Sequence, residues 1–95
     1  MYVRIIRGQT QPGQADALAQ QWQQFVLPRM QRASGLRQAY FAVNREANMS
    51  VGVSLRESRP DEATLNPLVE EFRAQAGELV AGQPTIEQYE VVVES

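Results

Sequence analysis

The sequence predicts one α+β domain in which strands and helices follow the order β-α-β-β-α-β. Three observations support this class. Apolar residues alternate with small or polar ones from Met49 to Glu57, which is typical of a strand with one buried face. Apolar residues between Ala15 and Met30 recur in steps of three and four, which is typical of a helix. The chain has 95 residues, so residues 1–95 are expected to form a single domain.

A strand and a helix come first. Residues Tyr2–Gln9 are rich in β-forming side chains, and Pro12-Gly13 ends the run. The helix that follows carries its apolar side at Ala15, Leu18, Ala19, Trp22, Phe25, Val26 and Met30. Pro28 is expected to kink this helix or to end its first part, because proline lacks a backbone donor. Ser34-Gly35 is expected to end the helix.

Two strands joined by a short loop come next and form a predicted hairpin. Tyr40, Phe41 and Val43 mark the first strand, Leu36–Asn44. Residues 44–48 form the loop, and Met49–Glu57 returns as the second strand. On this strand one face carries Val51, Val53 and Leu55, and the other carries Ser50, Gly52, Ser54 and Arg56.

A second helix and a fourth strand complete the order. The helical region is expected to begin at Arg59-Pro60-Asp61, with a second start at Asn66-Pro67, where asparagine would cap the helix and proline would take its first position. Its apolar face is predicted at Leu68, Val69, Phe72, Ala76, Leu79 and Val80. Gly82-Gln83-Pro84 is expected to stop the helix, and the last strand is expected over Thr85–Glu94.

This order predicts the ferredoxin-like layout, a four-stranded antiparallel sheet with two helices on one face. Several strands nevertheless carry apolar residues on both faces: Val3 and Ile5 oppose Ile6, and Val91 and Val93 oppose Val92. A domain of this size also buries a modest share of its surface and has no disulfide to compensate. We therefore expect a homodimer in which a second sheet covers the open face.

The composition excludes several classes of chemistry. The chain contains no cysteine and no histidine, and all nine of its basic residues are arginines. Thiol and imidazole catalysis, zinc-thiolate sites, histidine-ligated haem, Ser-His-Asp hydrolysis and lysine Schiff bases at internal positions are therefore excluded. We expect no metal site and no cofactor.

Charge and hydropathy narrow the range of possible partners and cellular locations. The net charge of −2 and the isoelectric point near 5.1 argue against nucleic acid, whose binding proteins usually present a basic face. The N-terminal Met-Tyr-Val-Arg-Ile-Ile-Arg is interrupted by arginine before it could serve as a signal peptide, and no apolar run is long enough to cross a membrane. A cytoplasmic protein is expected.

Four short motifs in this order give the chain a resemblance to a known family. They are Gln11-Pro12-Gly13-Gln14 after the first strand, Ser34-Gly35-Leu36 before the second, Leu55-Arg56-Glu57-Ser58 at the end of the third, and the closing Gln88-Tyr89-Glu90-Val91-Val92. Together they make the chain resemble the antibiotic biosynthesis monooxygenase-like (ABM) domains of the dimeric α+β barrel superfamily. The resemblance covers nearly the whole chain.

That resemblance implies a homodimer with its sheets face to face and a small apolar pocket between sheet and helices in each subunit. It further implies cofactor-independent oxygenation of an electron-rich phenol or, in some members, haem degradation. The sequence departs from both catalytic patterns. Members that oxidise polyketide-type phenols carry Asn and Trp where this chain has Gly52 and Arg56, and the haem-degrading members need a histidine. The catalytic residues are therefore unknown.

We expect the ligand site between helices and sheet. The residues predicted to line it are Trp22, Phe25, Gly52, Ser54, Arg56 and Phe72. Gly52 leaves space either for a ligand or for an aromatic neighbour such as Phe41. Arg56, at the pocket mouth, would orient an acidic or enolic oxygen or else pair with a glutamate. Trp22 would stack on a flat substrate or serve as core.

The remaining polar candidates are less specific. Tyr40 and Tyr89 would donate to a substrate oxygen or fill the dimer core, and no glutamate is singled out as a base. Two hypotheses follow. In one, the chain is a cofactor-independent monooxygenase of a phenol or quinol. In the alternative, it is a non-catalytic homodimer that binds a small aromatic or apolar ligand.

Overall fold

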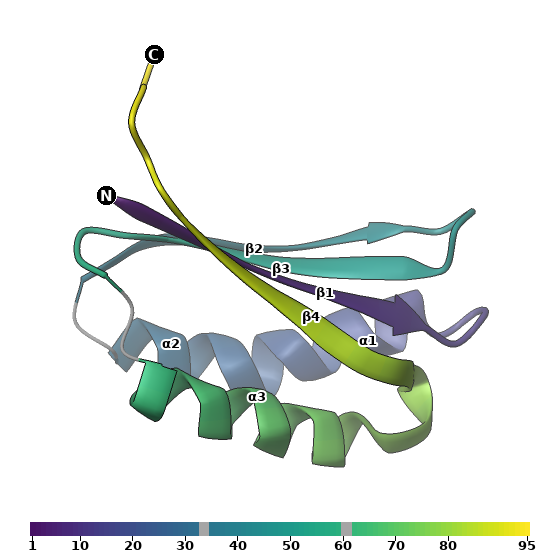
Figure 1. Ribbon diagram of the computed structural model, residues 1–95. Helices are drawn as coiled ribbons and strands as arrows, with labels where there is room; N and C mark the ends of the chain where they lie inside the picture. The colour runs from purple at the N-terminus through teal and green to yellow at the C-terminus, as the bar shows by residue number, and fades with distance from the viewer. Residues whose placement is uncertain (33–34, 60–61) are drawn as a thin grey trace.

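The computed structural model describes residues 1–32, 35–59 and 62–95 and has two layers, a sheet and a helical layer on one of its faces (Figure 1). The four strands are antiparallel and lie in the order β2-β3-β1-β4. Their bounds are Tyr2–Thr10 for β1, Leu36–Asn44 for β2, Met49–Arg56 for β3 and Val80–Glu90 for β4. The predicted ferredoxin-like α+β fold is confirmed.

The first helix runs without a gap through three segments: α1 (Ala15–Gln21), a π-helical turn (Trp22–Val26) and α2 (Leu27–Arg32). In the π turn the Leu27 amide donates to the Trp22 carbonyl, five residues back. Pro28 follows at once, and a proline can neither bond to the preceding turn nor fit its ring against it. The wider turn relieves this conflict, so Pro28 produces a π turn and the helix continues beyond it.

The second helix, α3, spans Glu62–Ala76 and contains Pro67 in its interior. The expected second start at Asn66-Pro67 is therefore wrong. The Asn66 side chain does not cap the helix, because its Oδ1 accepts a hydrogen bond from Arg4 Nη2 of the sheet at 3.0 Å. Packing of the apolar side of α3 against the sheet outweighs the helix-breaking tendency of proline.

The boundary between α3 and β4 also differs from the prediction. A 3₁₀ turn over Gly77–Leu79 follows the helix, and β4 begins at Val80, so Leu79 and Val80 lie beyond the α-helix. Residues 82–84 lie inside β4, where the register against β1 shifts between Arg7 and Gln9. Gly82 has a φ of +70°, a conformation open to glycine, and the irregular pairing tolerates the proline that follows. The Gly82-Gln83-Pro84 run, which was expected to stop the helix, therefore marks an irregularity within β4.

Strand β4 ends at Glu90, four residues before the predicted end at Glu94. The Val91 amide still donates to the Met1 carbonyl at 2.8 Å, and the chain then leaves the sheet on the side away from the helices (Figure 1). Val92 and Val93 on this tail are 82% and 84% exposed. Two other predictions, a stop at Ser34 and a helix start at Pro60-Asp61, lie outside the described residues.

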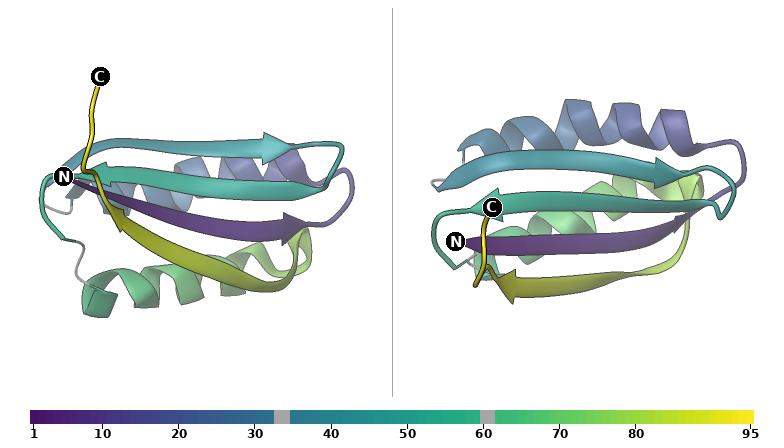
Figure 2. Two further views of the ribbon diagram at one scale, coloured as in Figure 1. Left: turned by 45° about the horizontal axis from the view of Figure 1, so that its top comes forward. Right: turned by 90° about the horizontal axis from the view of Figure 1, so that it is seen from above.

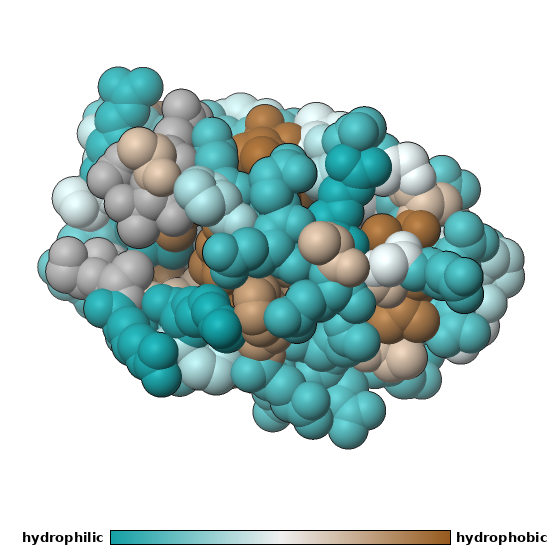
Figure 3. All heavy atoms as spheres, turned by 90° about the horizontal axis from the view of Figure 1, so that it is seen from below, coloured by the Kyte–Doolittle hydropathy of each residue, from teal (hydrophilic) through white to brown (hydrophobic). Residues whose placement is uncertain are grey.

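The two faces of the sheet are very different. One packs against the helices, whose outer surface is largely hydrophilic (Figure 3). The other is free of helices and is seen directly in the right panel of Figure 2. The cross-strand register places on this open face Val3, Ile5, Val51, Val53, Leu55, Tyr40 and Tyr89. Tyr40 and Tyr89 lie on the two edge strands, and both are more than half exposed.

Two further observations concern the described residues. None of their helices is both long and apolar enough to cross a membrane. Their His, Cys, Asp and Glu side chains do not gather in any group of three or more that could hold a metal ion.

Candidate functional site

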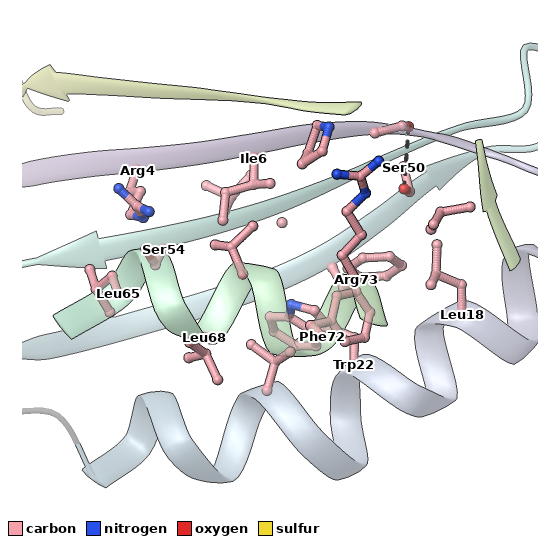
Figure 4. A pocket seen from close by; sticks show the side chains of 18 of the residues that line it. Arg4, Ile6, Leu18, Trp22, Ser50, Ser54, Leu65, Leu68, Phe72 and Arg73 are labelled. Atoms are coloured by element: carbon pink, nitrogen blue, oxygen red, sulfur yellow. Dashed lines mark hydrogen bonds between the residues drawn. The ribbon is translucent and has the colours of Figure 1, made fainter. Parts of the chain in front are cut away.

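A cavity of about 100 Å³ lies between the sheet and the helices. In Figure 4 it extends from Arg4, Ser54 and Leu65 at one end to Ser50 and Leu18 at the other. Most of its lining is aliphatic or aromatic and comes from both helices and from strands β1 and β3. Five of the six predicted ligand residues line it, namely Trp22, Gly52, Ser54, Arg56 and Phe72.

The strict alternation of β3 determines which of its side chains reach the cavity. Ser50, Ser54 and Arg56 are buried on the helix side, and Gly52 lies between them. Because three of these four residues are small, the sheet leaves room beneath the helices. The Ser50 hydroxyl donates a hydrogen bond to the Gly8 carbonyl oxygen at 3.4 Å.

Trp22 occupies the space above Gly52. A Cβ added to Gly52 would lie 3.5 Å from the Trp22 indole nitrogen, which is ordinary van der Waals contact. The indole also packs on Phe41, with ring centroids 5.4 Å apart and planes inclined by 31°. Trp22 is 9% exposed and belongs to the core cluster with Val26 and Met30. It is therefore both a core residue and a wall of the cavity.

Phe25 does not line the cavity, contrary to the prediction. It is partly buried against the cluster of Trp22, Val26 and Met30, and the Arg29 guanidinium stacks over its ring at 3.7 Å from the centroid. Arg29 Nη1 also donates to the Phe25 carbonyl at 2.8 Å. The prediction assumed regular helical spacing, but the π turn changes the angular position of the residues within it.

Arg56 lies inside the cavity wall and not at an exposed mouth. The residue is only 4% exposed. Its Nε and Nη2 atoms are buried and have no hydrogen-bond partner among the described residues. Burial lowers the pKa of this guanidinium, although arginine remains charged at neutral pH. The expected alternative, an ion pair with a glutamate, is not seen within the described ranges, where the adjacent Glu57 pairs with Arg37 at 2.8 Å.

A second buried arginine was missed by the sequence prediction. Arg4 is 3% exposed, faces Ser54 across the β1–β3 ladder and lines the same cavity. Its Nη2 donates to Asn66 Oδ1 at 3.0 Å. The alternation of β1 already placed Arg4 on the same side as Ile6, so a buried position was open to prediction. What was missing was the pairing that brings Arg4 beside Arg56.

Among the described residues, every charged side chain that lines the cavity is positive. Its charged lining residues are Arg4, Arg56 and Arg73, and no Asp or Glu lines it among the described residues. Arg73 is engaged, because its Nη1 donates to Gln83 Oε1 at 2.5 Å. The cavity can therefore stabilise negative charge and hold an apolar ring, and its described residues offer no carboxylate as a general base.

Comparison with known proteins identifies the fold. No protein-family model and no curated protein matches the sequence. Among solved structures, similar chains include a protein from Bordetella bronchiseptica and one from Nitrosomonas europaea, both provisionally named antibiotic biosynthesis monooxygenase, and Rv0793 from Mycobacterium tuberculosis.

The Bordetella chain is 21% identical with a TM-score of 0.75, and the match covers 97% of each chain. The Nitrosomonas chain is 14% identical with a TM-score of 0.75, covering 98% of this chain and all of the other. For Rv0793 the values are 19% and 0.70, with 99% and 97% covered. At these identities the likeness shows the fold alone, which this chain shares with those proteins over nearly its full length.

Proposed function

We propose that this chain is a cofactor-independent monooxygenase of a small phenol or quinol. The observation that carries the proposal is the cavity under β3, which combines an aromatic wall with buried guanidinium groups and no acidic side chain among its described lining residues. Such a site stabilises a phenolate, and a phenolate is the form that gives electrons to dioxygen most readily. The ABM-like fold supports the same assignment by analogy.

The proposed reaction balances without a cofactor. A quinol loses four electrons on conversion to a hydroxyquinone, and these reduce one dioxygen molecule. One oxygen atom enters the ring and the other leaves as water, with both hydrogens of the water coming from the substrate. The protein's tasks are to bind the ring, to stabilise the anion on Arg56 and to exclude water.

Oxygen uptake with a panel of hydroquinones tests the proposal. The wild-type chain is expected to accelerate uptake above the autoxidation rate, and Arg56→Ala is expected to remove most of the acceleration because the anion loses its partner. Ala74→Leu, an exposed change on α3, is the matched control and should behave as wild type. Uptake equal to autoxidation for the whole panel would favour the alternative, a non-catalytic binding protein for a small aromatic or apolar ligand.

We also propose that two copies associate through the open sheet face. This face presents a layer of valine, isoleucine and leucine with no helix over it, and the exposed Val92 and Val93 lie on a tail that leaves the sheet on that side. A second copy is the partner whose surface matches it, because both sheets would bury the same kind of residue. A cytoplasmic location and the absence of a nucleic-acid partner remain predictions from the sequence.

A further inference from the structure

The Arg56 guanidinium presents a charge that the described protein does not compensate. It is almost fully buried, and its Nε and Nη2 have no partner among the described residues. A buried ion is costly unless it is paired and hydrogen-bonded. Histidine or lysine could shed a proton in such a place, but arginine keeps its charge. An anion from outside the chain would satisfy this group.

The two unsatisfied atoms indicate the shape of that anion. Nε–H and one N–H of Nη2 point in parallel from the same edge of the guanidinium plane. This edge matches the two oxygens of a carboxylate, and such forked pairs are shorter and stronger than neutral hydrogen bonds. A single neutral acceptor would leave one of the two donors poorly satisfied.

The surroundings of Arg56 reinforce the preference for an anion. Arg4 lies on the neighbouring strand, on the same face of the sheet and equally buried. No acidic side chain lines the cavity among the described residues. A ligand carboxylate beside Arg56 would therefore face a favourable charge and, among the described lining residues, no repelling one.

The cavity also limits the rest of the ligand. From Arg56 to Gly52, beneath Trp22, the distance along β3 is about 13 Å, four strand residues. The cavity is bordered by Ile6, Leu68 and Phe72 among other residues (Figure 4). A dry cavity of about 150 Å³ can hold benzene. The cavity here, near 100 Å³, is smaller, so a single ring would need side-chain shifts and a fused ring system would need larger ones.

We infer that the cavity binds a single-ring aromatic carboxylate, with the carboxylate on the Nε–Nη2 edge of Arg56 and the ring extending toward Trp22. The inference rests on the proposed function for its site and specifies the substrate class: a phenol or quinol that carries a carboxylate. It would also hold for a non-catalytic domain, since it concerns binding alone.

Binding of benzoate and of benzamide, its neutral analogue of nearly the same shape, tests the inference. The chain has one tryptophan, so its single indole N–H resonance reports directly on the cavity. Wild-type protein at neutral pH is expected to bind benzoate about ten- to hundredfold more tightly than benzamide, the range set by a charge-assisted hydrogen bond. Equal affinities, or no shift with either compound, would overturn the inference without any variant.

Two substitutions assign the preference to Arg56. Arg56→Met keeps the length of the side chain and is expected to bring benzoate affinity down to that of benzamide. Arg37→Gln removes an exposed arginine and should leave the preference intact, which controls for net charge. A preference that survives Arg56→Met would contradict the assignment. Phenol, included as a third compound, separates a site for phenolate from a site for carboxylate, since binding tighter than benzoate would also contradict it.

The outcomes distinguish this inference from the proposed function. If benzoate is preferred through Arg56 but no hydroquinone accelerates oxygen uptake, the oxygenase proposal fails and the carboxylate site stands. If oxygen uptake is accelerated but benzoate and benzamide bind equally, the oxygenase stands and the carboxylate site fails.

Discussion

At the scale of single residues, Arg56 is the position where stability and binding are expected to conflict. Its cationic group lies in an apolar wall without a partner among the described residues. A buried charge without a partner weakens the fold, and a bound anion would offset that cost. Arg4 differs, because its Nη2 is held by Asn66.

Replacing Arg56 by methionine is expected to raise the free energy of unfolding. Methionine removes the buried charge and fills most of the same volume, and such exchanges are neutral or stabilising by about 1–4 kcal/mol. Urea and thermal unfolding measure the effect. Arg37→Met, at a side chain that is 52% exposed, should change stability by less than about 0.5 kcal/mol. A clear loss of stability in Arg56→Met would show that Arg56 has a structural role.

Gly52 offers a graded test of the cavity. Gly52→Ala places a methyl group in ordinary contact with the Trp22 indole, so stability should change by less than about 1 kcal/mol and ligand binding should persist. Gly52→Leu must displace the indole or fill the cavity, and binding of benzoate should be lost while the sedimentation behaviour stays that of wild type. Tight binding by the leucine variant would place the site elsewhere.

At the scale of elements, the junction of β1 with β4 carries a charged cluster on the open face. Arg7 Nε donates to Glu87 Oε2 at 2.7 Å, and the Tyr89 hydroxyl donates to Glu87 Oε1 at 2.9 Å. These hydrogen bonds lower the pKa of the Glu87 carboxyl, with Arg7 the larger cause, and Glu87 in turn raises the pKa of the Tyr89 hydroxyl. The pair is exposed in one copy, so its contribution to stability is small.

Arg7 lowers the pKa of the Glu87 carboxyl more than Tyr89 does, so substitutions of these two residues should shift that pKa by different amounts. Because the pKa of Glu87 is lowered by folding, its contribution is present above the unfolded pKa and is lost as pH falls through the folded pKa. Arg7→Gln should raise the pKa of Glu87 more than Tyr89→Phe does. Carboxyl carbon shifts in NMR titrations measure all three proteins. A larger effect from Tyr89→Phe would reverse the assignment of the main partner.

Comparison of the elements shows why the sequence predicted strand β3 more accurately than the two helices. Both helices contain a proline, one just after a π turn and the other inside α3. Local rules predict breaks at Pro28 and at Pro67, but the apolar faces around them pack against the sheet and keep the helices continuous. In contrast, the alternation of β3 predicted the direction of every side chain from Ser50 to Arg56.

At the scale of the whole molecule, the central question is what covers the open face. A single copy has a radius of gyration of 13.1 Å and leaves Tyr40, Tyr89 and the terminal valines largely exposed. If two copies pack sheet to sheet, the apolar layer between them becomes a second core, and the Arg7–Glu87 pair is partly desolvated. The association should then contribute much of the stability of so small a domain.

Val53→Glu tests this arrangement, because it places a carboxylate at the centre of the open face. In the dimer the charge would be buried without a partner, at a cost of several kcal/mol, so the variant is expected to dissociate or unfold. Light scattering at micromolar concentration measures the mass. Ala74→Glu, on the exposed side of α3, should leave the mass unchanged. A wild-type mass of 10.7 kDa, that of a single chain, would contradict the dimer.

The sequence by itself determined the order of elements, the two faces of β1 and β3 and the residue types that the chain lacks. These follow from local periodicity and from composition, which need no knowledge of long-range contacts. It also identified Trp22, Gly52, Ser54, Arg56 and Phe72 as neighbours of one space, because strand alternation and helical spacing point them the same way. Phe25 was misplaced since a π turn has no clear local signal.

Only the tertiary structure decided which side chains meet. The β1–β3 register brings Arg4 beside Arg56, and Arg4 in turn binds Asn66, sixty-two residues away along the chain. The strand register and the packing of the helices on the sheet depend on how much apolar surface the whole domain buries. This burial outweighs the helix-breaking tendency of Pro67 and the strand-breaking tendency of residues 82–84. The buried charge in the cavity wall exists only once those distant segments are packed together.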